Sequence, residues 1–310
     1  MKKKHLLSVW CRGGVLIACA LSLLLVSCGG GGGSDDDDTT AAGFVAVPGA
    51  TFDGTAAITG SQIFIAGRTV TIPSLLVCDH EVTQGEYEQY CSYGGSSPST
   101  TYGKGSSYPA YYVSWYDALV YCNKRSLADG RTPCYKINGE TNPSEWGTVP
   151  TSSNSTWNSA TCDFAANGYR LPTEAEWEYL ARGGNLTNSG QTTYSGSDTI
   201  GSVAWYKVNA CDVGSSSPDY GTHPVKTKAK NALNLYDMSG NVWELCWDWY
   251  DSISTSTPSS GAASGSNRIL RGGGWGSLAS YCTVSLRNPD CAPYYRNYYR
   301  GFRVVCSRSE

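Results

Sequence analysis

Hydrophobic residues along this chain are gathered in short segments that long polar stretches separate. The apolar run Phe44-Val45-Ala46-Val47, followed by Pro48-Gly49, predicts a strand and a turn. Weak alternation over residues 63–72 predicts the partner strand of a hairpin. Stretches rich in Ser, Thr, Asn and Gly, such as 148–159 and 254–266, predict long loops.

Three segments have the spacing of amphipathic helices: 83–90, 114–124 and 173–182. In the second, Ser114 is a suitable N-cap, and the residues that share one face are Trp115, Ala118, Leu119 and Cys122. In the third, Thr173 and Glu176 form a capping box, and Gly183 stands where the chain leaves the helix. Few regular elements over many residues predict an α+β, loop-rich single domain over 44–307.

The N-terminal residues predict export and anchoring. Basic residues 2–4 precede the short apolar run 15–26, which is the pattern of a signal peptide. The run ends in Leu25-Val26-Ser27-Cys28, which resembles a bacterial lipobox and implies removal of residues 1–27 and acylation of Cys28. Residues 28–43, rich in Gly and Asp, then form a flexible tether. The alternative is an ordinary signal peptide with an incidental cysteine.

Composition narrows the class of protein. The 310 residues include 10 Trp and 22 Tyr, too many aromatic side chains for a disordered chain. A net charge of −3 gives no basic surface for nucleic acid. No apolar stretch of about 20 residues follows the N-terminus, which excludes a polytopic membrane protein. The three histidines, His5, His80 and His223, are too few for a His-rich metal site.

Thirteen cysteines occur, and ten of them follow Cys28. Export would permit disulfides, but spacing does not reveal which residues pair. No C-x-x-C pattern is present, which argues against a structural zinc site. The ten are Cys78, Cys91, Cys122, Cys134, Cys162, Cys211, Cys246, Cys282, Cys291 and Cys306.

Four segments carry a family resemblance. They are NGYRLPTEAEWEY at 167–179, NLYDMSGNVWELCWDW at 234–249, RGGGW at 271–275 and GFRVV at 301–305. Together, and in this order, they resemble the formylglycine-generating-enzyme family, also called sulfatase-modifying-factor domains. The resemblance covers 44–307 and implies a C-type-lectin-like fold with little regular secondary structure.

The resemblance also bears on catalysis. Copper-dependent oxidases of this family hold Cu(I) with two cysteines, and Cys282 matches the first of them. The second would stand at position 287, which is Arg287, and Cys291 does not have the enzyme spacing. Another branch of the family uses iron held by several histidines, which this chain lacks. We therefore expect no catalytic residue and no redox cofactor, with Cys282 buried or in a disulfide.

A turn of the family pattern implies a structural calcium ion. In the enzymes, backbone carbonyls of a GNxWE turn and its glutamate bind calcium, and hard oxygen ligands suit this ion. The matching residues here are Gly240, Asn241, Val242 and Glu244. The alternative is that Glu244 caps backbone amides or pairs with an arginine, with no ion.

Residues 276–299 have an unusual composition. The segment contains no Lys, Glu, Gln, Met or Trp, five types that no codon ending in C encodes. Ten of its residues can be reached from the codon AAC by changing adenines: Gly276, Ser277, Leu278, Asp290, Cys291, Ala292, Tyr294, Tyr295, Tyr298 and Tyr299. This pattern resembles the product of a diversity-generating retroelement, and the chain resembles the retroelement-diversified variable lipoproteins of treponemes.

We expect this variable segment to bind a ligand. Its tyrosines offer large amphipathic contact area with few torsions to freeze. The expected contacts are Gly276, Ser277, Leu278, Ser280, Tyr281, Leu286, Asn288, Asp290, Cys291, Ala292, Tyr294, Tyr295, Asn297, Tyr298 and Tyr299. The residues expected to form the scaffold are Arg287, Arg296, Gly301, Phe302 and Arg303. The alternative is that the tyrosines pack on one another or line an ancestral cleft.

The sequence thus predicts a non-catalytic lipoprotein of a bacterial outer membrane or cell surface. Its ligand would vary among variants and be a protein or glycan of a host or of neighbouring microbes. The alternatives are a formylglycine-generating-type oxidase or its degenerate relative, and a structural envelope lipoprotein.

Overall fold

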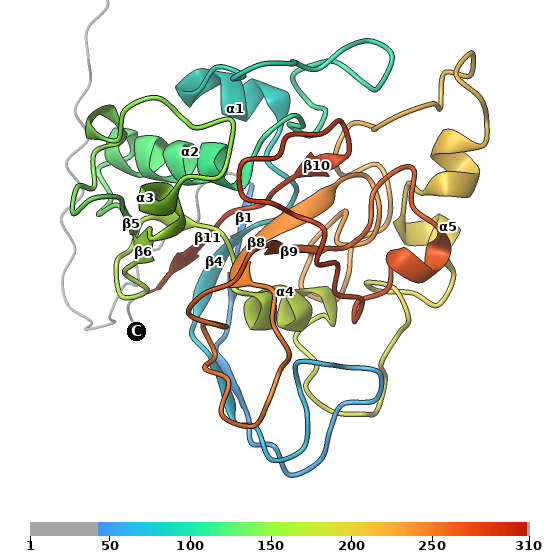
Figure 1. Cartoon of the computed structure of the whole chain (residues 1–310). Helices are drawn as coiled ribbons and strands as arrows, with labels where there is room; N and C mark the ends of the chain where they lie inside the picture. The colour runs from blue at the N-terminus through green and yellow to red at the C-terminus, as the bar shows by residue number, and fades with distance from the viewer. Residues whose placement is uncertain (1–42, 309–310) are drawn as a thin grey trace, which may run out of the picture. The chain divides into compact units, whose positions relative to one another are not determined.

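A computed structural model describes residues 43–308, which form a single domain of short strands and helices (Figure 1). The strands are β1 (Phe44–Val47), β2 (Ala50–Phe52), β3 (Val70–Ile72), β4 (Leu75–Cys78), β5 (Tyr135–Lys136), β6 (Thr161–Cys162), β7 (Tyr169–Arg170), β8 (Trp243–Trp249), β9 (Arg268–Arg271), β10 (Arg300–Gly301) and β11 (Val305–Ser307). The helices are α1 (Gln84–Tyr90), α2 (Trp115–Ala128), α3 (Ser155–Asn158), α4 (Glu174–Ala181) and α5 (Ile200–Val203), with single turns η1 (Pro143–Glu145), η2 (Lys207–Cys211) and η3 (Ala279–Tyr281). The predicted signal peptide, Cys28 and nearly all of the predicted tether lie outside the described residues.

The C-terminal strand joins distant parts of the chain in one sheet. β11 runs antiparallel between β4 and β7, so that Val305 is opposite both Val77 and Arg170. β1 completes the four-stranded order β1-β4-β11-β7. The first and last strands of the domain therefore belong to the same sheet.

The predicted strand β1 is confirmed, but its predicted partner is wrong. β1 pairs with β4 and not with the segment 63–72. Only the last three residues of that segment form a strand, β3, and this strand pairs with β2. The backbones pass very close at the turn before β2, where a Cβ on Gly49 would lie 2.9 Å from the backbone oxygen of Ile72.

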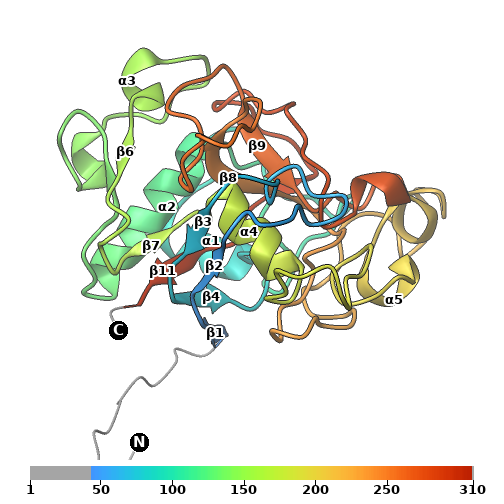
Figure 2. The same ribbon diagram turned by 90° about the horizontal axis from the view of Figure 1, so that it is seen from below.

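Two hydrophobic cores lie on opposite faces of the four-stranded sheet. Successive residues of β4 alternate between them, as side chains of a strand must. Leu75 and Val77 belong to the core that contains α4, whereas Leu76 and Cys78 belong to the core that contains α2. Figures 1 and 2 accordingly show the sheet between these two helices. A strand buried on both faces has no polar alternation, which explains the continuous apolar run in β4.

The three predicted helices are confirmed, and so are the N-caps predicted for the second and third, Ser114 and Thr173; Thr83 is the N-cap of α1. The capping box between Thr173 and Glu176 is present, and Gly183 takes a φ of +66° just after α4. α2 continues to Ala128, beyond its expected end at 124. The predicted loop 148–159 contains the short helix α3.

The three-stranded sheet positions the candidate site. β8 lies between β10, which is parallel to it, and β9, which is antiparallel. Segment 272–299 leaves the end of β9 and returns as β10, so both of its ends lie beside the start of β8 at Trp243 and Glu244. Gly301 in β10 must be glycine, because a Cβ there would lie 2.5 Å from the backbone oxygen of Ala110.

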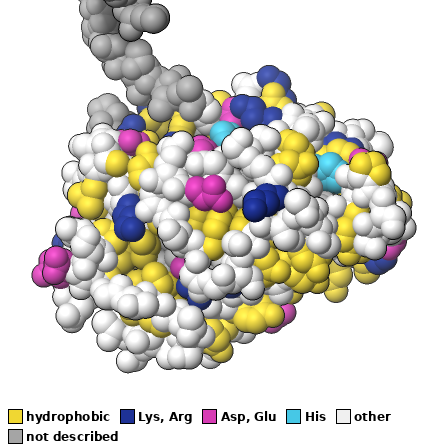
Figure 3. All heavy atoms as spheres, turned by 90° about the horizontal axis from the view of Figure 1, so that it is seen from above, with side chains coloured by type: hydrophobic (Ala, Val, Ile, Leu, Met, Phe, Trp, Pro, Cys, Tyr) yellow, Lys and Arg dark blue, Asp and Glu magenta, His cyan; other side chains and the backbone are white. Residues whose placement is uncertain are grey.

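Within residues 43–308, no helix is both long enough and apolar enough to cross a membrane. The face drawn in Figure 3 carries basic and acidic side chains scattered among polar and hydrophobic ones. This distribution agrees with the small net charge of −3.

Candidate ligand-binding site

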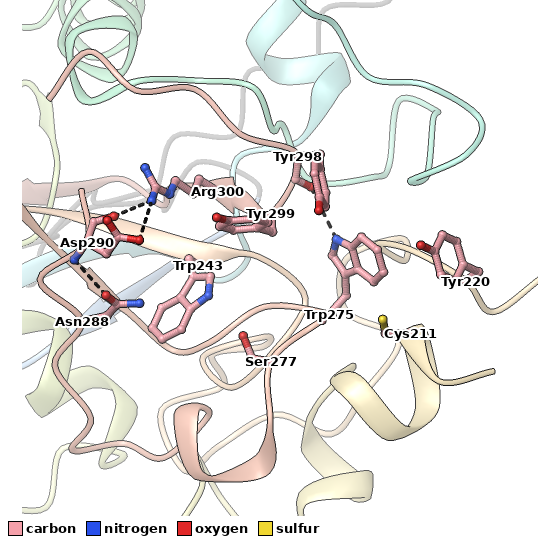
Figure 4. Close-up of a pocket in the computed structure, with 11 residues that line it drawn as sticks. Cys211, Tyr220, Trp243, Trp275, Ser277, Asn288, Asp290, Tyr298, Tyr299 and Arg300 are labelled. Carbon is pink, nitrogen blue, oxygen red and sulfur yellow. Dashed lines mark hydrogen bonds and ion pairs between the residues drawn. The ribbon is translucent and has the colours of Figure 1, made fainter. Parts of the chain in front are cut away.

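Two adjoining cavities open where segment 272–299 passes the start of β8. The aromatic cavity, of about 330 Å³, has walls that include Tyr220, Trp243, Trp275, Tyr298 and Tyr299 (Figure 4). The outer cavity, of about 580 Å³, has walls that include Lys207, Leu278, Tyr281, Leu286 and Arg287. The two cavities share Trp243, Gly276, Ser277, Asn288 and Asp290, so they form one continuous candidate site.

Backbone hydrogen bonds fix the walls of this site. The amide of Trp275 donates to the carbonyl of Asn241 at 2.7 Å, and the amide of Trp243 donates to the carbonyl of Tyr299 at 2.8 Å. The amide of Lys207 donates to the carbonyl of Ser277 at 2.9 Å, which attaches η2 to the variable segment. These bonds involve only main-chain atoms, so a substitution of an exposed side chain in the wall would not remove them.

Aromatic rings line the first cavity in a connected series. Tyr298 stacks on Tyr102 with ring centroids 4.4 Å apart, and it meets Tyr299 edge to face at 5.2 Å. Trp275 meets Tyr220 edge to face at 5.1 Å. Such pairs hold their rings in fixed orientations and present both π faces and hydroxyl groups to a ligand.

The polar groups of the site carry charges of both signs. The side chain of Asp290 is 87% exposed, whereas that of Arg300 is 2% exposed and donates to the backbone oxygen of Asp290. The guanidinium of Arg300 also lies over the ring of Tyr295 at 4.6 Å. Asn288 accepts a hydrogen bond from the amide of Asp290 at 2.9 Å. A buried cation thus supports an exposed carboxylate at the mouth of the site.

Nine of the fifteen predicted ligand contacts line the two cavities: Gly276, Ser277, Leu278, Tyr281, Leu286, Asn288, Asp290, Tyr298 and Tyr299. Ser280 and Tyr295 are exposed but lie outside both cavities. Ala292 and Tyr294 are half-buried, and the ring of Tyr294 packs against the hydrophobic core.

Two of the predicted contacts must be corrected. Cys291 is fully buried in the core, so its side chain cannot reach a ligand. Its carbonyl accepts a hydrogen bond from the amide of Arg268 at 2.7 Å, and this contact ties the segment to β9. Asn297 is also buried, and its side chain bonds to the amide of Tyr298 at 2.6 Å and to the hydroxyl of Tyr295. Both residues therefore support the segment from beneath.

Several residues of the site were not predicted. Lys207, Cys211 and Tyr220 come from a separate segment, and Trp243 and Arg300 come from β8 and β10. No local motif marks the segment 207–220 as part of a site. Trp243 and Arg300 could have been found only by placing the ends of the variable segment beside β8.

The residues expected to form the scaffold are structural. Phe302 is fully buried, and Arg287 and Arg296 pair with Glu174 and Asp117. Cys282 is a fully buried free thiol, and burial raises its pKa to about 12. A protonated thiol is a poor copper ligand, and the position of the second thiolate holds a buried guanidinium. All ten cysteines of the described domain are free thiols.

The turn at residues 240–244, where the family pattern implies calcium, does not fit an ion bound by Glu244. This carboxylate is fully buried, and Oε1 and Oε2 accept from the guanidinium of Arg303 at 2.7 and 2.6 Å. Oε2 also accepts from the indole nitrogen of Trp177 at 2.8 Å. Arg303 already supplies the positive charge that a calcium ion would supply. The alternative expectation, that Glu244 pairs with an arginine, describes this geometry, and no function is derived from calcium.

One group of metal-ligating side chains lies elsewhere in the described domain: Cys78, His80 and Glu86. Burial alone would lower the pKa of His80, but hydrogen bonds with Asp79, Cys78 and Glu86 outweigh it and raise the pKa to about 12. A protonated imidazole has no lone pair for a metal. Lys226, which pairs with Asp79 at 2.6 Å, extends the group into an ion-pair network.

Comparison with known proteins gives one family match over most of the chain. A family model described as the sulfatase-modifying factor enzyme 1-like domain matches residues 33–308. The chaperone protein LppX of Paenibacillus barcinonensis is 37% identical over 238 residues, which cover 73% of this chain and 78% of that protein. The formylglycine-generating enzyme of Streptomyces coelicolor is 38% identical over 140 residues, which cover 41% of this chain and 42% of that enzyme.

Solved structures agree with this match. Treponema denticola variable protein 1 superposes with a TM-score of 0.69 at 33% identity, covering 86% of this chain and 95% of that one. A structure of CarF superposes with a TM-score of 0.62 at 24% identity, covering 86% and 98% of the two chains, which supports the fold alone. The predicted family resemblance and C-type-lectin-like fold are confirmed.

Proposed function

The chain belongs to the family of sulfatase-modifying factor enzyme 1-like domains, and on that premise we propose that it is a non-catalytic, lipid-anchored binding protein. Its ligand would occupy the aromatic and outer cavities, and diversification of residues 276–299 would change which ligand fits. Similarity to Treponema denticola variable protein 1 over 86% of the chain supports this proposal.

One observation carries the proposal. Nine of the fifteen contacts predicted in the segment selected by its codon-related composition line one continuous pair of cavities. Two residues expected to form the scaffold, Arg287 and Arg296, pair with carboxylates of α4 and α2, and Arg287 also forms part of the wall of the outer cavity. Most positions proposed to vary are therefore distinct from the residues whose ion pairs hold the fold, which a diversified site requires.

An oxidase of the formylglycine-generating type is not favoured. Such an enzyme needs two thiolates, but Cys282 is buried as a thiol and position 287 holds an arginine paired with Glu174. The segment aligned with the Streptomyces coelicolor enzyme also spans less than half of that enzyme.

Anchoring and location are part of the same proposal. Cleavage before Cys28 and acylation of this residue would place the binding domain outside the cell on the tether 28–43. The membrane would be a partner only through the lipid. Ligands of host or neighbouring cells, proteins or glycans, would then be within reach.

A single substitution tests the binding site. Gly276 lines both cavities, and a Cβ added there meets no atom within 4 Å. Gly276→Trp should therefore fill the site without straining the fold. The full chain would be screened against arrays of glycans and extracellular proteins, with Ser280→Trp, an exposed position of the same segment outside both cavities, as the matched control.

Ligands found with the wild-type protein should be lost by Gly276→Trp and kept by Ser280→Trp. Equal binding by both variants would place recognition elsewhere. Diversification has a separate test in the genome. A near-copy of the coding sequence for 276–299, rich in AAC codons and beside a reverse-transcriptase gene, is expected, and its absence would contradict this part of the proposal.

A further inference from the structure

Two basic side chains that line the outer cavity already have carboxylate partners in this chain. Arg287 donates to both oxygens of the Glu174 carboxylate, at 2.7 and 2.8 Å. Lys207 pairs with Asp212. Their positive charges are therefore compensated, and neither side chain makes the site attractive to an anion.

The carboxylate of Asp290 is in the opposite situation. Asp290 lines both cavities, and its side chain is 87% exposed. Within residues 43–308 this carboxylate accepts no hydrogen bond, and its Oδ2 lies 3.8 Å from Nη2 of Arg300. Nη2 itself donates to the backbone oxygen of Asp290, and the side chain of Arg300 is only 2% exposed. The charge that the site presents to an entering ligand is thus negative.

Aromatic rings adjoin this carboxylate. Figure 4 shows Asp290 and Asn288 at one end of the aromatic cavity, with Trp243 and Tyr299 next along it and Trp275 further away. None of the described residues that line this cavity is Leu, Ile, Val or Met. The π faces of Trp and Tyr attract cations, as a carboxylate does. Both features favour a positively charged group in the aromatic cavity.

The mouth of the outer cavity is apolar. Leu278 and Tyr281 line this cavity, and both side chains are exposed. Val208 is also exposed, and it follows Lys207, whose amide is bonded to the carbonyl of Ser277. Large apolar side chains that gather at one exposed place are typical of a surface that contacts another protein.

The same surface is unfavourable for a glycan. Leu286 and Pro289 line the outer cavity together with Leu278, and these three side chains offer no hydrogen bond. Sugar hydroxyl groups that lose water against them would be left without partners, which is costly. An apolar side chain of a protein gains free energy from the same contact. The outer cavity therefore favours a protein ligand.

We propose that the ligand of this chain is a protein segment that carries one basic and one apolar side chain. This inference rests on the proposed function and names the ligand class of the same site. The basic side chain lies against Asp290 in the aromatic cavity, and the apolar one lies on Leu278 and Tyr281. Because Asp290 lines both cavities, neighbouring side chains of one segment can reach both positions. Asparagine, which the codon AAC encodes, has no charge, so diversification at position 290 would switch this preference.

Calorimetry on the purified full chain tests the inference with defined peptides. The probes are Leu-Gly-Arg and Arg-Gly-Leu, acetylated at the N-terminus and amidated at the C-terminus, so that the guanidinium is their only charge. In matched peptides, citrulline, a neutral analogue of arginine with nearly the same shape, or glutamate replaces the arginine. One arginine peptide should bind at least about fivefold more tightly than its citrulline counterpart. The glutamate peptides should bind most weakly.

Three variants assign the preference to its residue. Asp290→Asn removes the charge of an exposed side chain, so the arginine and citrulline peptides should bind to it equally. Asp251→Asn is the matched control, since Asp251 is exposed and outside both cavities, and it should keep the preference for arginine. Gly276→Trp should abolish binding of both peptides, because it fills the site.

Equal binding of the arginine and citrulline peptides by the wild-type protein would overturn the inference, as would an unchanged preference in Asp290→Asn. Failure of every peptide to bind would also contradict it. A glycan whose binding is lost in Gly276→Trp would overturn the inference but leave the proposed function standing. Peptide binding that Gly276→Trp does not affect would instead count against the proposed function, so the two failures are distinguishable.

Discussion

The guanidinium of Arg287 holds the carboxylate of Glu174 through two hydrogen bonds, Nε to Oε1 at 2.7 Å and Nη2 to Oε2 at 2.8 Å. Both side chains are almost fully buried. The pair ties the wall of the outer cavity to α4 at the position where the copper oxidases of this family carry their second cysteine. Arg287 therefore stands where those oxidases have a metal ligand, and in its place it forms a buried ion pair that links the segment to α4.

Replacing this arginine with the cysteine of the oxidases should destabilise the protein. Arg287→Cys leaves the buried Glu174 carboxylate without its main partner, and breaking a buried pair in this way costs about 3–5 kcal/mol. Denaturant unfolding measures the change. The double variant Arg287→Cys/Glu174→Gln should recover part of the loss, because no unpaired charge is left. A loss below about 1 kcal/mol in the single variant would show that the pair is not structural.

The wild-type protein should not convert cysteine to formylglycine. Cys282 is a buried thiol whose pKa burial raises to about 12, so it is not a thiolate at neutral pH. Purified protein supplied with Cu(I), oxygen and a sulfatase-type cysteine peptide should give no product by mass spectrometry. The background is set by a Cys282→Ala variant. Turnover above that background would exclude a purely binding function.

The features that the sequence predicted well depend on neighbouring residues. Thr173 caps the amide of Glu176 three residues away, so the start of α4 is visible in a short segment. By contrast, the pairing of β11 with β4 joins Val305 to Val77 across most of the domain. No short-range pattern encodes that contact, and the hairpin predicted for β1 failed for the same reason.

The candidate site was likewise predictable only where the information lies in neighbouring residues. Composition predicted the segment 276–299, and most of its chosen positions line the cavities. Composition could not show that Cys291 is buried, because its burial depends on the contact of its carbonyl with Arg268 in β9. Nor could it show Tyr220, whose ring meets Trp275 only after the chain has folded.

The proposed acylation of Cys28 implies a membrane-bound protein. Cys28→Ser removes the atom that would carry the lipid, and within residues 43–308 no helix could cross a membrane. The variant should lose labelled palmitate and leave the membrane fraction, whereas Cys19→Ser, within the predicted signal peptide, should not. If Cys28→Ser fractionates and labels like the wild type, the lipoprotein prediction is wrong.

The ion-pair network around His80 should make stability depend on pH. Its pKa in the fold is about 12, against an ordinary value of 6.5. A raised pKa means that the stabilisation is complete below about pH 6.5 and is lost as pH rises towards the folded value. The gap in unfolding free energy between wild type and His80→Gln should therefore shrink from pH 6 to pH 9.

His223 provides a control, because its contribution to stability should depend on pH in the opposite direction. Burial lowers the pKa of His223, which stacks on Trp205 with ring centroids 3.5 Å apart. Its contribution is present above the ordinary pKa and is lost as pH falls through the folded value. The difference in unfolding free energy between wild type and His223→Gln should therefore become smaller as the pH is lowered. Parallel trends for the two variants would contradict the assignment of charge to His80.

The tyrosines of the variable segment should differ in what they contribute to stability. Tyr295 is 45% exposed, so Tyr295→Ala should change the unfolding free energy by no more than about 0.5 kcal/mol. Phe302 is fully buried, and Phe302→Ala should cost about 3–5 kcal/mol. Tyr299→Ala should fall between them, since its half-buried ring packs against the core.

Thermal melts of Tyr295→Ala, Tyr299→Ala and Phe302→Ala measure this expected order of stability loss. Tyr294 and Tyr299 are partly buried and pack against the core, and Tyr299 also lines the aromatic cavity, so these two positions contribute to the fold as well as to the segment. A diversified position must nevertheless accept small residues without unfolding the domain. Should Tyr295→Ala lose as much stability as Phe302→Ala, even the exposed part of the segment would be structural, and the proposal of a variable binding surface would fail.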